Sequence, residues 1–280
     1  MEPRCHFLAV TVLFKTALSR SASLQSWSRC VASGHNVTCI VWDNSPHGAG
    51  LEELAWLREN LPAAVYRHTP ENVPLSRIYN SVIDEFLRPD DAPFEALVIT
   101  DQDSDFLPAL LDEASAAMDT HPEVSLFLPH VIANDAIVSP ANVYGCVGLP
   151  WRHKRAGTIT ARSRTAINSG MIIRREYLVR RFIGYDERLR FYGTDNDFCR
   201  KYATTERWLY VLNSVVTHSL ARDADETRDV KLWRHRENVR ALLVTHSGDW
   251  IGRVTSRAYC AVYCSKKAMA ERDLAFLSWG

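Results

Sequence analysis

Short apolar runs alternate with helix-like repeats along the first hundred residues of the chain. The apolar runs predict buried strands over 6–14, 37–42, 65–68 and 95–100. Between them, apolar residues recur every three or four positions, which predicts helices built on three sets of residues: Leu24, Trp27 and Val31; Leu51, Leu54, Leu57 and Leu61; and Leu75, Ile78, Tyr79, Val82, Ile83 and Phe86. Strands and helices that alternate at this spacing favour an α/β fold, with a parallel sheet covered by helices on both faces.

The second half of the chain has a weaker pattern. We expect strands over 124–129, 168–173 and 207–217, a helix over 194–202, and irregular or edge structure over 135–148. Residues 221–280 predict helices. A helical C-terminal extension therefore follows the α/β part of the chain.

Composition and charge narrow the class of protein. Basic and acidic residues are equal in number, 33 each, so no global positive field draws the chain to nucleic acid, and we expect no nucleic-acid partner. The chain does not open with a basic region and a long apolar core, and no apolar run approaches the roughly 20 residues that span a bilayer. We therefore expect a cytoplasmic protein. Seven cysteines without a C-x-x-C pair predict reduced thiols rather than a zinc site.

Two carboxylates follow the strand expected at 95–100. Asp101 and Asp103 are two residues apart, so in an extended chain their side chains point to the same side. At the carboxyl end of a parallel strand, where such sheets bind ligands, they offer oxygen ligands to Mg²⁺ or Mn²⁺ bound to substrate phosphates. The alternative is a turn rich in aspartate. Asp105, close to the helix expected at Pro108, fits a cap or turn residue better than a ligand.

The segment Thr194-Asp195-Asn196-Asp197 opens the helix expected at 194–202. Thr194 and Asp197 have the spacing of a helix N-cap and its partner. That pairing leaves Asp195 unexplained, and a carboxylate in a first helical turn can face a cleft and accept a proton from a hydroxyl. The helix N-terminus would keep such a base ionised and would also weaken it.

Asp43 and His218 each end a predicted strand. Asp43 is either a cap in the turn that follows it or an acceptor for an N–H or hydroxyl group of a bound base or ribose. His218 is a structural histidine, unless it faces the same metal ion as Asp103 and binds that ion as neutral imidazole.

Residues 136–175 contain no acidic residue and seven basic ones. We expect a mobile basic loop here that neutralises a leaving diphosphate or binds a phosphorylated acceptor, with a solvated surface as the alternative. The candidate acceptor or phosphate ligands are Arg152, Lys154, Arg155 and Arg162.

Four segments occur in a specific order and spacing along the chain. They are Val41-Trp42-Asp43-Asn44-Ser45, Asp101-Gln102-Asp103-Ser104, Asn168-Ser169-Gly170-Met171-Ile172-Ile173, and the run over 184–199. Together they resemble the inverting family 2 glycosyltransferases with the GT-A fold, particularly the bacterial rhamnosyltransferase-like members. The resemblance covers residues 7–218. It departs from the family at Leu13-Phe14-Lys15, where Thr-Tyr-Asn is frequent, and at Val73-Pro74, where a glycine is usual.

The resemblance implies a Rossmann-like, mostly parallel sheet flanked by helices. It implies a GT-A domain over residues 1–220, with a nucleotide-binding half over 1–105 and an acceptor-binding half over 106–220. A helical C-terminal extension would occupy residues 221–280.

The resemblance also implies roles for the candidate residues. The nucleotide-sugar donor, a dTDP- or UDP-sugar, would be bound by Asp43, Asn72, Arg77 and Asp101. Asp103 and His218, with Asp101, would hold Mg²⁺ or Mn²⁺, and Asp195 would be the catalytic base of a single-step inverting transfer. The acceptor would be a glycan or lipid-linked glycan of a bacterial surface polysaccharide or lipopolysaccharide, and the sugar transferred would be rhamnose or a related one.

Two other functions stay open. A sugar nucleotidyltransferase would share the core and the metal carboxylates, but it normally has a glycine-rich basic loop after the first strand, and residues 14–21 contain no glycine. A non-catalytic nucleotide-sugar binding module would have no need of a base at Asp195. Residues 251–279 mix five basic residues with apolar and aromatic ones. This mixture is typical of a helix at the inner face of the cytoplasmic membrane, or of one packed on the catalytic domain.

Overall fold

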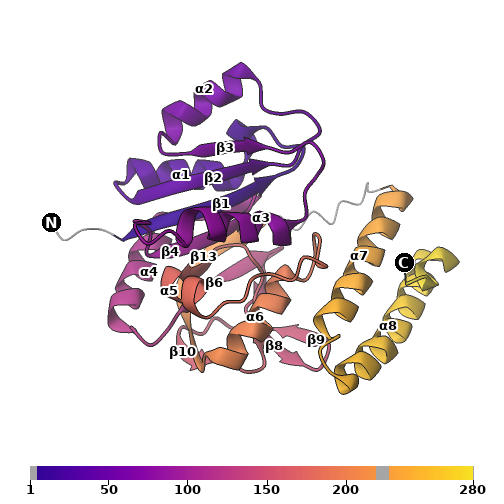
Figure 1. Cartoon of the computed structure of the whole chain (residues 1–280). Helices are drawn as coiled ribbons and strands as arrows, with labels where there is room; N and C mark the ends of the chain where they lie inside the picture. Colours follow the sequence, from indigo (N-terminus) through magenta and orange to yellow (C-terminus); the bar gives the residue numbers. More distant parts are fainter. Residues whose placement is uncertain (1–4, 219–226, 280) are drawn as a thin grey trace.

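A computed structural model describes residues 5–218 and 227–279 of the chain (Figure 1). Its centre is a mixed sheet in the strand order β10-β13-β6-β12-β4-β1-β2-β3. Four neighbouring strands are parallel, namely β1 (His6–Leu13), β2 (Asn36–Asp43), β3 (Val65–His68) and β4 (Ala96–Asp101). The predicted α/β fold with a mostly parallel sheet is confirmed.

The other half of the sheet also includes antiparallel strands. The strand β12 (Met171–Arg174) runs antiparallel to both β4 and β6 (Leu126–Ala133), whereas β13 (Trp208–His218) runs parallel to β6. The edge strand β10 (Gly157–Thr160) pairs antiparallel with β13. The short strands β5 (Ser104–Asp105) and β7 (Ala136–Ser139) pair with β13 and β6 respectively.

Alternate residues of β1 face two separate hydrophobic clusters, as a strand buried on both faces requires. Phe7 and Ala9 belong to one cluster, and Leu8 and Val10 belong to the other. The first cluster contains residues of α1 (Ala22–Ala32) and α4 (Ala109–Thr120). The second contains residues of α3 (Leu75–Val82), α5 (Arg175–Arg180) and α6 (Thr194–Thr205). Helices thus cover both faces of the sheet.

Two elements complete the first half of the chain. The helix α2 (Leu51–Asn60) follows β2, and a π-helical turn, η2 (Ile83–Leu87), continues α3. A short 3-10 helix, η1 (Leu18–Arg20), precedes α1 in the loop after β1. These elements lie where the apolar repeats predict helices, apart from η1.

The region expected to be irregular or edge structure, 135–148, contains short paired strands. Besides β7, it contains β8 (Ala141–Tyr144) and the start of β9 (Val147–Pro150), which pair as a hairpin. Together with β11 (Arg164–Thr165) they form a second, three-stranded sheet. The expectation of a mobile basic loop is wrong for residues 157–160, because β10 is hydrogen-bonded to β13. The strand expected at 124–129 begins and ends later, at Leu126 and Ala133.

The C-terminal part consists of α7 (Arg228–Thr245), α8 (Trp250–Glu271) and the 3-10 helix η3 (Leu274–Leu277). In Figure 1, α7 and α8 lie side by side at the edge of the molecule. They share two small hydrophobic clusters of their own, one around Phe276 and one around Val239, Cys260 and Cys264. Among the described residues, no helix has the length and apolar character needed to cross a membrane.

Candidate active site

The predicted donor and metal residues lie at one edge of the central sheet. Because β2, β4 and β13 run in the same direction, their carboxyl ends meet at the same edge. Asp43 is the last residue of β2, Asp101 the last of β4 and His218 the last of β13. The turn after β4 returns as β5, in which Ser104 pairs with His218. This pairing brings Asp103 beside the imidazole.

A chain of polar contacts joins Asp103, His218, Ser169 and Asp101. The Nδ1 atom of His218 lies 3.2 Å from Oδ1 of Asp103 and 3.3 Å from Oγ of Ser169. The Ser169 hydroxyl donates to Oδ2 of Asp101 over 2.5 Å. Burial raises the pKa of Asp103, and the charge of Asp101 adds to this effect, whereas His218 opposes it. The Ser169 hydroxyl and the His218 imidazole together therefore connect Asp101 to Asp103.

This arrangement has the donor chemistry that Mg²⁺ or Mn²⁺ requires. The contacts of Asp103 and Ser169 fall on Nδ1 of His218, which leaves Nε2 as the ring nitrogen for a ligand, a tautomer arrangement common at metal-binding histidines. The described residues hold no ready-made group of three His, Cys, Asp or Glu side chains for an ion. Mg²⁺ is commonly bound through one or two carboxylates and substrate phosphates, so the pair Asp103 and His218 with Asp101 nearby fits such an ion.

Asp195 lies in the first turn of α6, half-buried, and its charge interacts with that of Asp101. Burial raises the pKa of Asp195 to about 6, the charge of Asp101 contributes to the rise, and the backbone N–H of Asn196 opposes it. That N–H donates to Oδ1 of Asp195 over 2.7 Å. The expectation that the helix N-terminus weakens this base is wrong, because burial outweighs the local hydrogen bond. A carboxylate with this pKa is a stronger base than an exposed one.

The start of α6 also differs from the expected N-cap. Gly193, with φ of 80°, occupies the cap position, and no side chain forms a cap hydrogen bond there. Thr194 is the first residue of the helix. The Thr194 hydroxyl instead accepts from Nδ2 of Asn168 over 3.2 Å. Asp197 pairs with Lys201 one turn later, with Oδ2 2.7 Å from Nζ. Thr194 therefore ties α6 to the segment before β12, whereas Asp197 pairs within α6, and the two do not form the expected cap.

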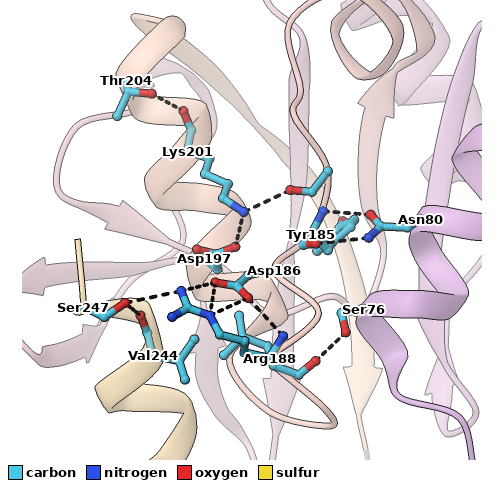
Figure 2. Close-up of polar contacts among 12 residues, drawn as sticks. Ser76, Asn80, Tyr185, Asp186, Arg188, Asp197, Lys201, Thr204, Val244 and Ser247 are labelled. Carbon is cyan, nitrogen blue, oxygen red and sulfur yellow. Dashed lines mark hydrogen bonds and ion pairs between the residues drawn. The ribbon is translucent and has the colours of Figure 1, made fainter.

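Figure 2 shows how the loop 184–193, which leads into α6, is attached to two helices. Asn80 of α3 donates from Nδ2 to the carbonyl of Tyr185 over 3.0 Å and accepts from the Tyr185 N–H over 2.8 Å. Lys201 of α6 donates to the carbonyl of Gly184 over 2.9 Å and also pairs with Asp197. The position of Asp195 thus depends on contacts between segments far apart in sequence.

A second set of contacts attaches the same loop to the C-terminal helices. Arg188 pairs with Asp186, 2.6 Å apart, and also donates to the Ser247 hydroxyl just after α7 (Figure 2). Gly193 packs so closely on α7 that an added Cβ would lie 3.0 Å from Cβ of Ala241. The helix α7 therefore lies directly over the beginning of α6.

Asp43 lines a cavity of about 530 Å³ at the ends of β1 and β2. Its buried carboxylate accepts from the Ser45 N–H over 2.9 Å and from the Tyr66 hydroxyl over 2.7 Å. Burial and the nearby Asp43 raise the pKa of Tyr66 to about 12, so Tyr66 stays a donor. Each carboxylate oxygen has a second acceptor position, which leaves Asp43 able to accept from a ligand.

The remaining predicted residues are dispersed. Arg77 is exposed and pairs with Glu187 over 3.1 Å, and Asn72 takes a positive φ of 50° in the turn before α3. Arg152, Lys154 and Arg155 are exposed, and the Arg155 N–H donates to Nε2 of buried His130 over 3.0 Å. Arg162, in contrast, lines a second cavity beside α6.

The sequence did not single out Ser169, Tyr66 or Asn80 as site residues, although Ser169 lies within one of the four family-like segments. The glycine that follows it was the available signal. Gly170 has φ of 80°, and an added Cβ would lie 2.8 Å from Pro129 and from Val216. Only glycine fits this contact with β13, and it brings Ser169 next to His218.

No protein-family model matches the sequence, and no curated protein matches it. Solved structures with the same fold do match. The chain is similar to S. aureus TarS 1–349 in complex with UDP, with a TM-score of 0.55 and 13% identity over 94% of this chain and 72% of that one. The same fragment in another crystal structure gives a TM-score of 0.52 and 14% identity over 85% of this chain and 65% of that one.

A structure of GalNAc-T7 with UDP, GalNAc and Mn²⁺ is also similar, with a TM-score of 0.55 and 12% identity. It is matched over 87% of this chain and 48% of that one, so the chain spans about half of GalNAc-T7. Likeness at this level of identity shows the fold. The chain has the GT-A fold of glycosyltransferases.

Proposed function

We propose that the protein is a metal-dependent, inverting glycosyltransferase of the family 2 type, which transfers a sugar from a nucleotide diphosphate to an acceptor hydroxyl. The observation that carries the proposal is the cluster of Asp101, Asp103 and His218 at the carboxyl edge of the sheet, with the charge of Asp101 acting on the carboxylate of Asp195. The pKa of Asp195 is raised to about 6 by burial and by Asp101, the residue that begins the acidic turn at the edge of the sheet. A base and an acidic turn side by side serve a transfer reaction, whereas a binding module needs no base.

In the proposed reaction, Asp195 accepts the proton of the acceptor hydroxyl while that oxygen attacks the anomeric carbon of the donor. Asp103 and His218, with Asp101, would hold the divalent ion. When bound, the ion offsets the negative charge that develops on the leaving diphosphate. The Ser169 hydroxyl contacts both Asp101 and His218 and holds these two side chains in position. Asp43 accepts a hydrogen bond from the nucleoside in the cavity at the ends of β1 and β2.

The choice of donor is supported by the similar structures. TarS has been solved in complex with UDP and with UDP-GlcNAc, and GalNAc-T7 with UDP and Mn²⁺. We therefore propose a UDP- or dTDP-linked donor and Mn²⁺ or Mg²⁺ as cofactor. We further propose a glycan or lipid-linked glycan acceptor of a bacterial surface polysaccharide, with rhamnose among the sugars to be tested, and a cytoplasmic location at the inner face of the membrane.

A screen of nucleotide sugars for release of nucleoside diphosphate, with Mn²⁺ and with EDTA, tests the proposal. We expect release from at least one UDP- or dTDP-sugar with Mn²⁺, and a strong reduction with EDTA. Release of pyrophosphate from a nucleoside triphosphate and a sugar phosphate would instead identify a nucleotidyltransferase. If a nucleotide sugar binds but is not turned over, with or without an acceptor glycan, the protein is a non-catalytic binding module. The anomeric configuration of the product, read by NMR, decides between inversion and retention.

A further inference from the structure

A second cavity, of about 930 Å³, lies between the three-stranded sheet, α6 and α7. Its charged lining consists of four cations and one carboxylate: Arg162, Arg164, Arg200 and Lys201, with Asp197. The helix α7 contributes a wall through residues such as Leu242 and His246. The cavity therefore has a strong excess of positive charge in a chain whose net charge is zero.

The positive charge in this cavity is largely unpaired. Lys201 is paired with Asp197, whose Oδ2 lies 2.7 Å from Nζ. Among the described residues, no carboxylate forms an ion pair with Arg162, Arg164 or Arg200. Arg164 donates from Nη1 to the carbonyl of Ser163 over 3.0 Å, and its buried Nε has no hydrogen-bond partner in the described part of the chain.

A buried histidine adds another polar group without a partner. His246, at the end of α7, is 8% exposed and lines the cavity. Its Nδ1 lies 3.0 Å from the carbonyl of Leu242, whereas its buried Nε2 has no hydrogen-bond partner among the described residues. Buried polar atoms are nearly always hydrogen-bonded, so Nε2 of His246 and Nε of Arg164 indicate a polar ligand.

The cavity lies beside the proposed base, although Asp195 itself does not line it. Gly193 and Asn196, on either side of Asp195 in the chain, line it. Asn196 donates from its side chain to Oδ1 of Asp195 over 3.3 Å and accepts from the hydroxyl of Thr165, another lining residue, over 2.6 Å. A molecule in this cavity therefore lies one residue away from the carboxylate that would activate its hydroxyl.

We infer that this cavity binds a phosphate group on the acceptor, next to the hydroxyl that receives the sugar. The inference rests on the proposed function and names the class of acceptor, a phosphate-bearing glycan or lipid. Planar guanidinium groups suit the oxygens of a phosphate through paired hydrogen bonds, and Arg162, Arg164 and Arg200 surround one space. The cavity is distinct from the donor site, whose candidate residues are Asp43 and the Asp103–His218 pair.

Calorimetric titration with glucose 6-phosphate, glucose and octyl phosphate in the presence of EDTA tests the inference. We expect saturable binding of a phosphate probe and none of glucose. The double variant R164Q/R200Q should weaken it by about tenfold or more, as expected for lost hydrogen bonds to a charged group. The variant R200Q, at an exposed position, should weaken it less while keeping the fold, as thermal unfolding would verify. R58Q, on exposed Arg58 of α2, removes the same charge elsewhere and should bind normally.

The outcomes separate the inference from the proposed function. Tighter binding of octyl phosphate supports a lipid phosphate, and tighter binding of glucose 6-phosphate supports a glycan phosphate. The inference is overturned if neither phosphate binds, if glucose binds as well as glucose 6-phosphate, or if R164Q/R200Q binds normally while D103A does not. Donor turnover by the unaltered protein is measured separately, so its absence would refute the glycosyltransferase and leave the phosphate result standing.

Discussion

Replacing Asp195 by asparagine should make the protein more stable and nearly inactive at the same time. The pKa of Asp195 is raised from 3.8 to about 6, mainly by burial. The folded state therefore binds a proton more tightly than the unfolded state, and the ionised carboxylate costs stability above that range. This cost in stability is small below pH 4, grows between about pH 4 and pH 6, and is constant above pH 6.

The size of this cost follows from the shift. A rise of roughly two pKa units corresponds to about 3 kcal/mol at most, because each unit is about 1.4 kcal/mol. Asparagine keeps an oxygen that can accept from the Asn196 N–H, so we expect D195N to gain about 1–3 kcal/mol at pH 8. About half of the gain should remain at pH 5, where Asp195 is mostly protonated in the folded protein.

Urea unfolding of D195N and of the unaltered protein at pH 5 and pH 8 measures this gain. The matched control is D197N on the same helix, which removes the partner of Lys201 and should lower stability. In parallel, kcat/KM of the unaltered protein should rise with pH up to about 6, and D195N should lose about 10²–10⁴ of the rate. A D195N protein that is less stable at pH 8, or whose gain is equal at both pH values, would refute the buried-carboxylate reasoning. Loss of donor affinity with an unchanged rate would make Asp195 a binding residue.

Three further changes test other parts of the structure. D103A should abolish donor turnover while leaving the fold intact, and undiminished transfer by this variant in EDTA would contradict the metal assignment. G170A should cost about 2–4 kcal/mol of unfolding free energy, because φ is 80° and a Cβ would meet Pro129 and Val216; a cost below about 1 kcal/mol would contradict this packing. A chain ending at Asp249 lacks α8, so it should lose any binding to anionic liposomes that the full chain shows at low salt. Equal sedimentation of both chains would exclude α8 as the membrane contact.

The first half of the fold was predictable because its signals are strong and local. Three of the four parallel strands, β1, β2 and β4, are apolar runs buried on both faces, and the helices between the strands repeat at the helical period. The missed strands lack this pattern: all four residues of β9 are exposed, and β10 is a short edge strand. Exposed strands need no apolar alternation, so nothing in their sequence distinguishes them from a loop.

Long-range contacts explain why the site was only partly predictable. The sequence placed Asp43, Asp101 and His218 at strand ends, and parallel strands bring such ends together. It could not reveal that Ser169 links Asp101 to His218, or that Glu187 pairs with Arg77, because these partners are distant in the chain. For Asp195 even the direction of the pKa shift was wrong, since the helix N-terminus is visible in sequence and burial is not.

The division of the chain at residue 220 remains a prediction, and the acceptor side of the site extends across it. Gly193 precedes α6 at φ of 80°, and α7 lies so close that Cβ of Ala241 would be 3.0 Å from a Cβ at this position. His246 and other residues of the same helix then line the cationic cavity beside Asp195. Since α7 both covers Gly193 and forms this wall, the C-terminal helices contribute to acceptor binding in the proposed reaction, whether or not α8 also contacts a membrane.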